Sequence, residues 1–186
     1  VKFGYNPDNV IIHDFSANVR PGQKVAIVGP TGAGKTTMVK LLMRFYDVNS
    51  GKIMLDGHNV KDYNRRDLRS AFGMVLQDTW MFEGTVRENL VYNKANVSDE
   101  KLDEVCRAVG LMDLIDQLPN RYDTVLGDNA SISAGQKQLF TIARAMLEDA
   151  PLIILDEATS SVDTRTELQV QRAMDMLTRG RTSFVI

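Results

Sequence analysis

Eight consecutive residues near the N-terminus constrain the fold more than any other part of this sequence. Residues 29–36 read Gly-Pro-Thr-Gly-Ala-Gly-Lys-Thr and fit the pattern G-x-x-x-x-G-K-[ST]. The short β-branched run at residues 24–28 before them is typical of a buried strand. The apolar residues after them, from Met38 to Phe45, recur at i, i+3, i+4 and i+7, which predicts a helix. A loop between a strand and a helix is the context in which this pattern binds phosphate, so we expect a phosphate-binding loop here.

Each part of this loop has a physical role toward an anion. Glycines allow consecutive backbone N–H groups to converge on a phosphate, and a helix that begins near Gly34 adds its positive end. Lys35 supplies a mobile charge for the outer phosphates, and the hydroxyl of Thr36 can ligate Mg²⁺. The residues that we expect to contact the phosphate ligand are Gly29, Thr31, Gly32, Ala33, Gly34, Lys35, Thr36 and Thr37.

The remaining sequence patterns predict an α/β core interrupted by a helical part. Residues 1–76 carry strand patterns, including 14–19 and 52–55, and residues 150–186 alternate strand, helix and strand. Residues 77–149 carry only helical patterns, so we expect them to form a helical subdomain inserted into the core. Within residues 77–149 we expect helices at 85–92, 98–109, 112–118 and 134–148. Within residues 150–186 we expect a strand at 152–155, a helix at 164–178 and a strand at 183–186.

Two acidic residues follow the predicted strand at 152–155. Asp156 and Glu157 would lie at the carboxyl end of that strand, the edge at which open α/β sheets bind ligands. Beside a triphosphate, Asp156 would hold Mg²⁺ and Glu157 would act as general base toward the attacking water. A solvated strand end is the alternative, but the phosphate loop upstream favours the functional interpretation.

The predicted helix at 134–148 begins with a second potential anion site. Ser133 is a favoured N-cap residue, and Gln136 three positions later completes a capping box. One interpretation is simply a well-capped helix. The other is a phosphate receptor, because a serine hydroxyl, the backbone at Gly135 and free N–H groups at a helix start suit an anion.

These features together resemble a known family. Residues 132–136, Ile-Ser-Ala-Gly-Gln, are similar to the LSGGQ signature of ABC ATPases. With the phosphate loop, Leu-Asp-Glu-Ala-Thr-Ser at 155–160 and Ser-Val-Asp at 161–163, the whole chain resembles the nucleotide-binding domain of an ABC transporter. The resemblance implies a P-loop NTPase (RecA-like) α/β core with an N-terminal antiparallel β part and an inserted helical subdomain. The segment at 81–90 resembles exporter-type domains.

The resemblance also implies roles for individual residues. Gln77 would contact Mg²⁺ and the attacking water and link the domain to the membrane part, while Asp163 would act across a dimer. Tyr5 resembles the aromatic residue that stacks on adenine, although a strand tyrosine packed in the core is the alternative. ATP and Mg²⁺ are the implied cofactors. Ser133, Gly135 and Gln136 would contact the ATP of a partner subunit.

The implied function is an ATPase that hydrolyses the β–γ phosphate bond to power export. Two such domains, identical or different, would pair head to tail around two ATP molecules at the cytoplasmic face of the cell membrane. They would bind the transmembrane domains of an exporter. Two departures favour an alternative, a nucleotide-gated binding module with little turnover. Ala134 replaces a signature glycine, and the switch histidine expected after the last strand is not reached by Ile186, which suggests C-terminal truncation.

Composition excludes other classes. The 22 lysines and arginines against 24 aspartates and glutamates give a net charge of −2, which offers no electrostatic footprint for nucleic acid. This charge also disfavours an ABC ATPase that works on DNA or ribosomes. No apolar run approaches the ~20 residues of a membrane span, and the single cysteine, Cys106, cannot form an internal disulfide.

Overall fold

The fold is organised around a four-stranded parallel sheet. The structure, a computed structural model, describes the chain except residues 7, 77–78, 93, 127–131 and 157–163. The strand order is β1-β8-β7-β4, with bounds Lys24–Ala26, Thr182–Val185, Leu152–Leu155 and Phe72–Val75. Because all four strands are parallel, their carboxyl ends lie at one edge, and the phosphate loop and Asp156 both follow strands that end there.

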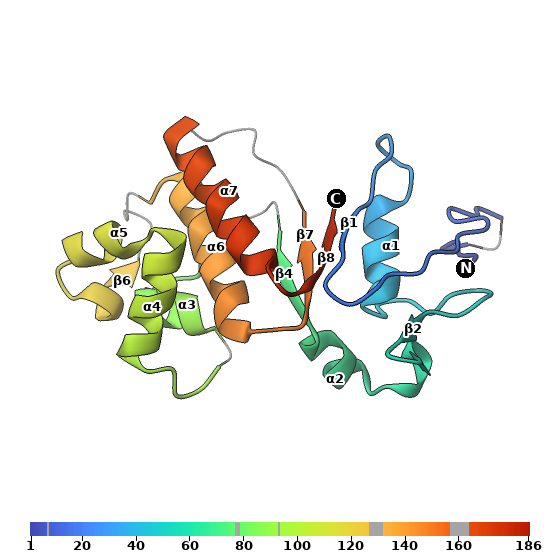
Figure 1. Ribbon diagram of the computed structural model, residues 1–186, viewed down its shortest axis with the longest axis horizontal. Coiled ribbons are helices and arrows are strands. Elements are labelled where there is room, and N and C mark those ends of the chain that lie inside the picture. The colour runs from blue at the N-terminus through green and yellow to red at the C-terminus, as the bar shows by residue number, and fades with distance from the viewer. Residues whose placement is uncertain (7, 77–78, 93, 127–131, 157–163) are drawn as a thin grey trace.

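Helices cover both faces of this sheet (Figure 1). Helix α1 (Lys35–Leu42) lies on one face, and α6 (Ala134–Glu148) and α7 (Thr164–Thr178) lie on the other. Strand β7 alternates accordingly. Ile154 belongs to the apolar cluster with Val39 of α1, whereas Ile153 and Leu155 belong to the cluster that includes α6 and α7. A strand that is apolar at every position is thus buried on both sides, as parallel sheets require.

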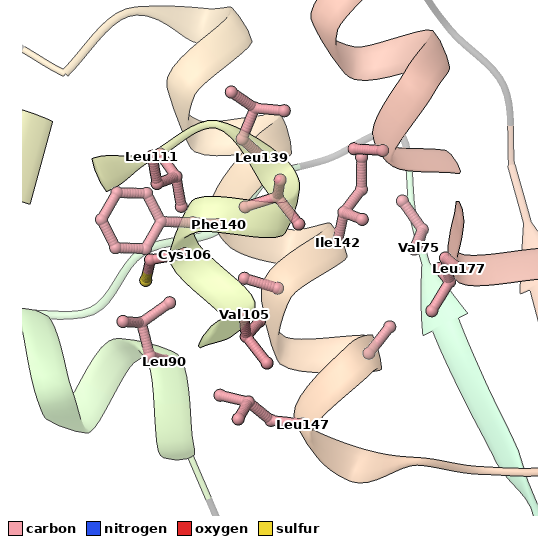
Figure 2. Close-up of a cluster of buried hydrophobic side chains, with 14 of the residues drawn as sticks. Val75, Leu90, Val105, Cys106, Leu111, Leu139, Phe140, Ile142, Leu147 and Leu177 are labelled. Carbon is pink, nitrogen blue, oxygen red and sulfur yellow. The ribbon is translucent and has the colours of Figure 1, made fainter. Parts of the chain in front are cut away.

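A group of shorter helices packs against the outer side of α6. These are α3 (Val86–Val91), α4 (Asp99–Val109) and α5 (Met112–Gln117). Figure 2 shows Phe140 of α6 pointing toward Cys106 and Leu111, with Leu90 and Val105 nearby, and all of these side chains are buried. This core is continuous with the side chains that cover the sheet, since the same cluster contains Val75 and Leu177.

The antiparallel pairs are short. In the N-terminal part, Phe3 bridges to Ile12, and β2 (Met54–Leu55) pairs with β3 (His58–Asn59) across the turn at Asp56-Gly57. In the helical part, β5 (Gly84–Thr85) pairs with β6 (Val125–Leu126). The remaining elements are the 3₁₀ turns Val60–Asp62 and Arg121–Asp123 and the helix α2 (Arg65–Ser70).

Several local predictions are wrong. Residues 77–149 are not purely helical, because β5 and β6 lie among them. Residues 14–19 form no strand, and Phe15 is 45% exposed. The alternating pattern misled the prediction, because the neighbours of Phe15 are weak strand formers and no sheet face lies beneath its side chain. Val28 is 85% exposed because β1 ends at Ala26 on the edge of the sheet. Phe45 lies beyond the end of α1 and stacks under the guanidinium of Arg69 at 4.3 Å.

Candidate functional site

The loop at residues 29–36 joins β1 to α1, as the motif predicted. Gly32 and Gly34 have positive φ angles of 83° and 86°, a conformation that favours glycine. Gly34 is the N-cap of α1, and a Cβ there would approach the Cγ2 of Ile11 to 2.8 Å. The backbone conformation of the loop therefore requires these glycines. In this conformation the loop leads directly into the N-terminus of α1, whose free N–H groups suit an anion.

Lys35 is folded over the beginning of the loop. Its Nζ donates hydrogen bonds to the carbonyl oxygens of Gly29 at 2.7 Å and Pro30 at 2.9 Å. The positive charge therefore lies at the loop itself, beside the N-terminus of α1. Because an ammonium on a flexible stem is a mobile point charge, these carbonyl contacts can be exchanged for phosphate oxygens without a change in the backbone.

Thr36 and Asp156 line the same cavity, which has a volume of about 410 Å³. Thr36 lies in the first turn of α1, and Asp156 follows β7 and is held by a 2.8 Å hydrogen bond from its N–H to the carbonyl of Val75. The structure thus places two of the predicted magnesium residues together. The other predicted residues at this centre, Gln77 and Glu157, lie outside the described residues.

The donors at this cavity fit Mg²⁺. Mg²⁺ prefers hard oxygen ligands and is usually held by one or two carboxylates together with phosphates and waters. Thr36 offers a hydroxyl and Asp156 a carboxylate. Within the described ranges, no group of three or more His, Cys, Asp or Glu side chains could hold a metal by itself. A site made of a few protein oxygens and the ligand's own phosphates therefore suits this cavity.

Tyr5 lies next to the helix that follows the phosphate loop. Its phenol oxygen is 3.2 Å from the hydroxyl oxygen of Thr37, and its ring meets those of Phe3 and Tyr46 edge to face at 5.1 and 5.0 Å. The side chain is 43% exposed, so the alternative of a tyrosine packed in the core is wrong; the buried aromatic residue of this segment is Phe3. Tyr5 is thus available to a flat ligand.

Ser133 begins α6 with the predicted capping box. Its hydroxyl oxygen accepts from the N–H of Gln136 at 3.1 Å, and the Gln136 side chain accepts from the N–H of Ser133 at 2.9 Å. Ser133 and Ala134 are exposed, whereas Gly135 is buried. Figure 1 shows α6 and α1 on opposite sides of the sheet, and Ser133 does not line the cavity that contains Thr36.

Two residues of the cavity and one residue of α6 were not among the predicted site residues. Phe45 and Tyr46, which follow α1, line the cavity beside Thr36 and Asp156. The available signal was this pair of adjacent aromatic residues at the end of the predicted helix. The role of Arg144 was not predicted either, because the apolar face of α6 explained the residues around it and gave no sign of a function for the arginine.

No helix in the part of the chain that the structure describes is long and apolar enough to cross a membrane.

Comparison with known proteins gives consistent matches. The family model described as "ABC transporter" matches residues 12–160. The chain is 54% identical over 187 residues to the "Fatty acid ABC transporter ATP-binding/permease protein" of Mycobacterium tuberculosis, covering 100% of this chain and 30% of the relative. It is 44% identical over 187 residues to the "ATP-dependent lipid A-core flippase" of Syntrophus aciditrophicus, covering 100% of this chain and 31% of that protein.

A solved structure is also similar over the full chain. It is that of a bacterial Atm1-family ABC exporter with ATP bound, with a TM-score of 0.88 and 39% sequence identity. The match covers 100% of this chain and 33% of the exporter chain. The present chain therefore spans about a third of the length of the proteins that it resembles.

Proposed function

Since the chain belongs to the ABC transporter family, we propose that it is the ATP-binding and ATP-hydrolysing domain of an exporter. The observation that carries this proposal is that Thr36, the last residue of the phosphate loop, lines the same cavity as Asp156, the residue at the carboxyl end of β7. A triphosphate bound in the loop would have its outer phosphates within reach of both residues and of the Lys35 ammonium.

The protein groups would act mainly by position and charge. The loop N–H groups and the start of α1 would bind the phosphates, and Lys35 would leave the carbonyls of Gly29 and Pro30 to neutralise the outer ones. Thr36 and Asp156 would hold Mg²⁺, which when bound neutralises charge that develops on the phosphate oxygens. Glu157 is the proposed general base toward the attacking water, and Gln77 is proposed to contact that water.

The position of Ser133 supports a head-to-tail dimer. Ser133 is exposed and begins α6, which lies on the opposite face of the sheet from α1 (Figure 1), so Ser133 and the phosphate loop would act on one ATP only if they came from different subunits. The capping bond uses the Ser133 oxygen as an acceptor, so its O–H is still a donor. We therefore assign Ser133, Gly135 and Gln136 to the ATP of a second nucleotide-binding domain.

An aromatic surface beyond β4 supports a membrane partner. The Trp80 side chain is 60% exposed and that of Tyr92 is 54% exposed, and both rings lie near that of Phe82 at 5.6 and 6.3 Å. Exposed aromatic groups of this kind are typical of protein interfaces. We assign this surface to the transmembrane part of the exporter, which places the domain at the cytoplasmic face of the cell membrane.

Binding and turnover of MgATP test the proposal. Lys35→Ala is expected to weaken ATP binding at least about tenfold, because it removes the charge beside the outer phosphates. Lys52→Ala, at an exposed lysine away from the loop, is the matched control. Glu157→Gln is expected to bind MgATP and form dimers without turnover, which sedimentation velocity would detect. If the unaltered chain does not bind MgATP at about 1 mM nucleotide, the proposal is wrong.

A further inference from the structure

The guanidinium of Arg144 fastens one segment of the chain to α6. Its Nε donates to the carbonyl oxygen of Asn89, its Nη1 to that of Trp80 at 2.9 Å, and its Nη2 to the Asn89 Oδ1 at 3.1 Å. Nη2 also lies 3.5 Å from the sulfur of Met81. All of these acceptors belong to residues 80–89, so these hydrogen bonds connect two parts of the chain and none stays within α6.

Asn89 organises the same segment from inside. It is fully buried, and its Nδ2 donates to the carbonyls of Phe82 and Thr85 at 3.0 and 3.1 Å. Its Oδ1 accepts from the N–H of Phe82 at 3.1 Å as well as from Arg144. Because both donors and both acceptor positions of the amide are used, Asn89 connects α3 to the backbone at Phe82 and Thr85, and Arg144 in turn holds Asn89.

Apolar packing alone does not hold the beginning of this segment. Val86 and Leu90 are buried in the main core and anchor α3. Trp80, by contrast, is 60% exposed, and its backbone carbonyl is held by Arg144. Next to it, Met81 packs against the main core, so the chain at Trp80 is held both by this packing and by the polar contact of Arg144.

This segment directly follows the residue expected to act at the nucleotide. Strand β4 ends at Val75, and the chain passes through Gln77 before it reaches Trp80. Arg144 lies on the same helix as Ser133, roughly 16 Å along its axis. One guanidinium thus joins the helix that starts at the signature motif to the chain that leaves Gln77.

We propose that Arg144 is a positioning residue that locks residues 80–89 to α6, so that the aromatic surface at Trp80 and the Ser133 end of the helix move as one body. This inference rests on the proposed function, in which Ser133 contacts a partner's ATP. Lysine would replace arginine only in part, since the planar fork of donors reaches acceptors on several residues whereas an ammonium is a single point charge.

Trp80 is the only tryptophan of the chain, so its fluorescence reports directly on this contact. In the full chain, Arg144→Met is expected to raise acrylamide quenching of Trp80 about twofold, since the hydrogen bond from Arg144 to the Trp80 carbonyl is lost. In the same variant we expect the ATPase kcat to fall about tenfold while KM and ATP affinity stay within about twofold, because the loop at Gly29–Thr36 is untouched. Arg144→Lys should rescue kcat only in part and still raise quenching.

Lys94→Met is the matched control. The Nζ of Lys94 donates to the carbonyl of Leu147 at 2.6 Å, so this substitution also removes a hydrogen bond between the chain after α3 and α6. It leaves the Arg144 contacts in place, and we expect wild-type quenching and wild-type kcat. A folded protein is verified in each case by urea unfolding followed by circular dichroism.

Three results overturn the inference. The first is wild-type quenching and kcat in a folded Arg144→Met protein. The second is an equal change in Lys94→Met, which indicates general loosening. The third is wild-type quenching in Arg144→Lys, and it decides the matter if Arg144→Met fails to fold. Failure of the proposed function is distinguishable, because the unaltered chain would then bind no MgATP while the difference in Trp80 quenching between variants persisted.

Discussion

The phenol oxygen of Tyr5 lies 3.2 Å from the hydroxyl oxygen of Thr37, which links the N-terminal segment to the first turn of α1, the helix that follows the phosphate loop. Phe3 and Tyr46 support the Tyr5 ring from its sides, each meeting it edge to face, and the ring is partly open to solvent. This arrangement holds a π-face near the loop that we propose binds the phosphates of ATP.

We expect Tyr5→Ala to weaken ATP binding about tenfold, the scale of losing one stacking contact between an aromatic ring and a base. Tyr5→Phe should bind ATP almost normally, because the ring is kept and only the contact with Thr37 is lost. Titration with a fluorescent ATP analogue measures both. Tyr92→Ala, at an exposed aromatic residue of the helical part, is the control. Equal affinity in Tyr5→Ala and the unaltered chain would contradict the adenine assignment.

Asp156→Asn tests the metal side of the cavity. The substitution keeps the size of the side chain but removes the charge that faces the same space as Thr36. We expect magnesium-dependent ATP hydrolysis to fall about a hundredfold, the scale of losing one contact to transition-state charge. Binding of ATP in the presence of EDTA should change little, since it depends on the loop. A parallel loss of metal-free binding would show that Asp156 holds the loop and not the metal.

Strong local signals in the sequence predicted the centre of this fold. The loop from Gly29 to Thr36, the β7 strand before Asp156 and the capping box at Ser133 each depend on neighbouring residues, so a short pattern was enough. Predictions that depend on distant partners were weaker. Val28 follows an edge strand and is exposed, and β5 pairs with β6 across a long stretch of chain that local patterns cannot reveal.

The position of Arg144 illustrates the same limit at the site. Nothing near it in sequence indicates that its guanidinium will reach Trp80 and Asn89, because those contacts exist only after α3 has packed on α6. The available hint was Asn89 itself, which shares one face of α3 with the apolar residues Val86 and Leu90, since a buried amide needs partners.

Stability should fall as pH rises above about 9. Burial raises the pKa of the Cys106 thiol to about 11 from its ordinary value of 9.0. Desolvation likewise raises the pKa of the Tyr122 hydroxyl, which also donates to Asp103 at 2.6 Å. Between the unfolded and folded pKa values the folded state keeps a proton that the unfolded state loses, so raising the pH favours unfolding. For Cys106 alone this amounts to about 1 kcal/mol at pH 10.

Urea unfolding at pH 7, 9 and 10, compared between the unaltered chain and Cys106→Ala, measures this effect. The variant is expected to be less stable at pH 7, because a buried sulfur is removed from the core. Its stability should nevertheless decline less between pH 9 and 10. Identical pH slopes for the two proteins would show that the thiol contributes nothing to the decline.

Ser133 has two roles that different substitutions separate. As N-cap it accepts from the N–H of Gln136, and as a proposed ATP contact it donates its O–H to a phosphate oxygen. Ser133→Asp keeps a good capping acceptor at the positive end of α6, so stability should be unchanged or slightly higher. A carboxylate cannot donate to phosphate and repels it. We therefore expect ATP-dependent dimerisation to be lost.

Ser133→Ala provides the complementary result. It removes the cap and should lower the free energy of unfolding by about 1 kcal/mol, while it adds no charge at the interface. We therefore expect Ser133→Ala to be the less stable protein but the better dimer, and Ser133→Asp to be the reverse. Urea unfolding gives the first quantity, and sedimentation velocity with MgATP in a Glu157→Gln background gives the second. If both variants dimerise like the unaltered protein, Ser133 is only a helix cap, and the phosphate that we assign to it must be bound elsewhere.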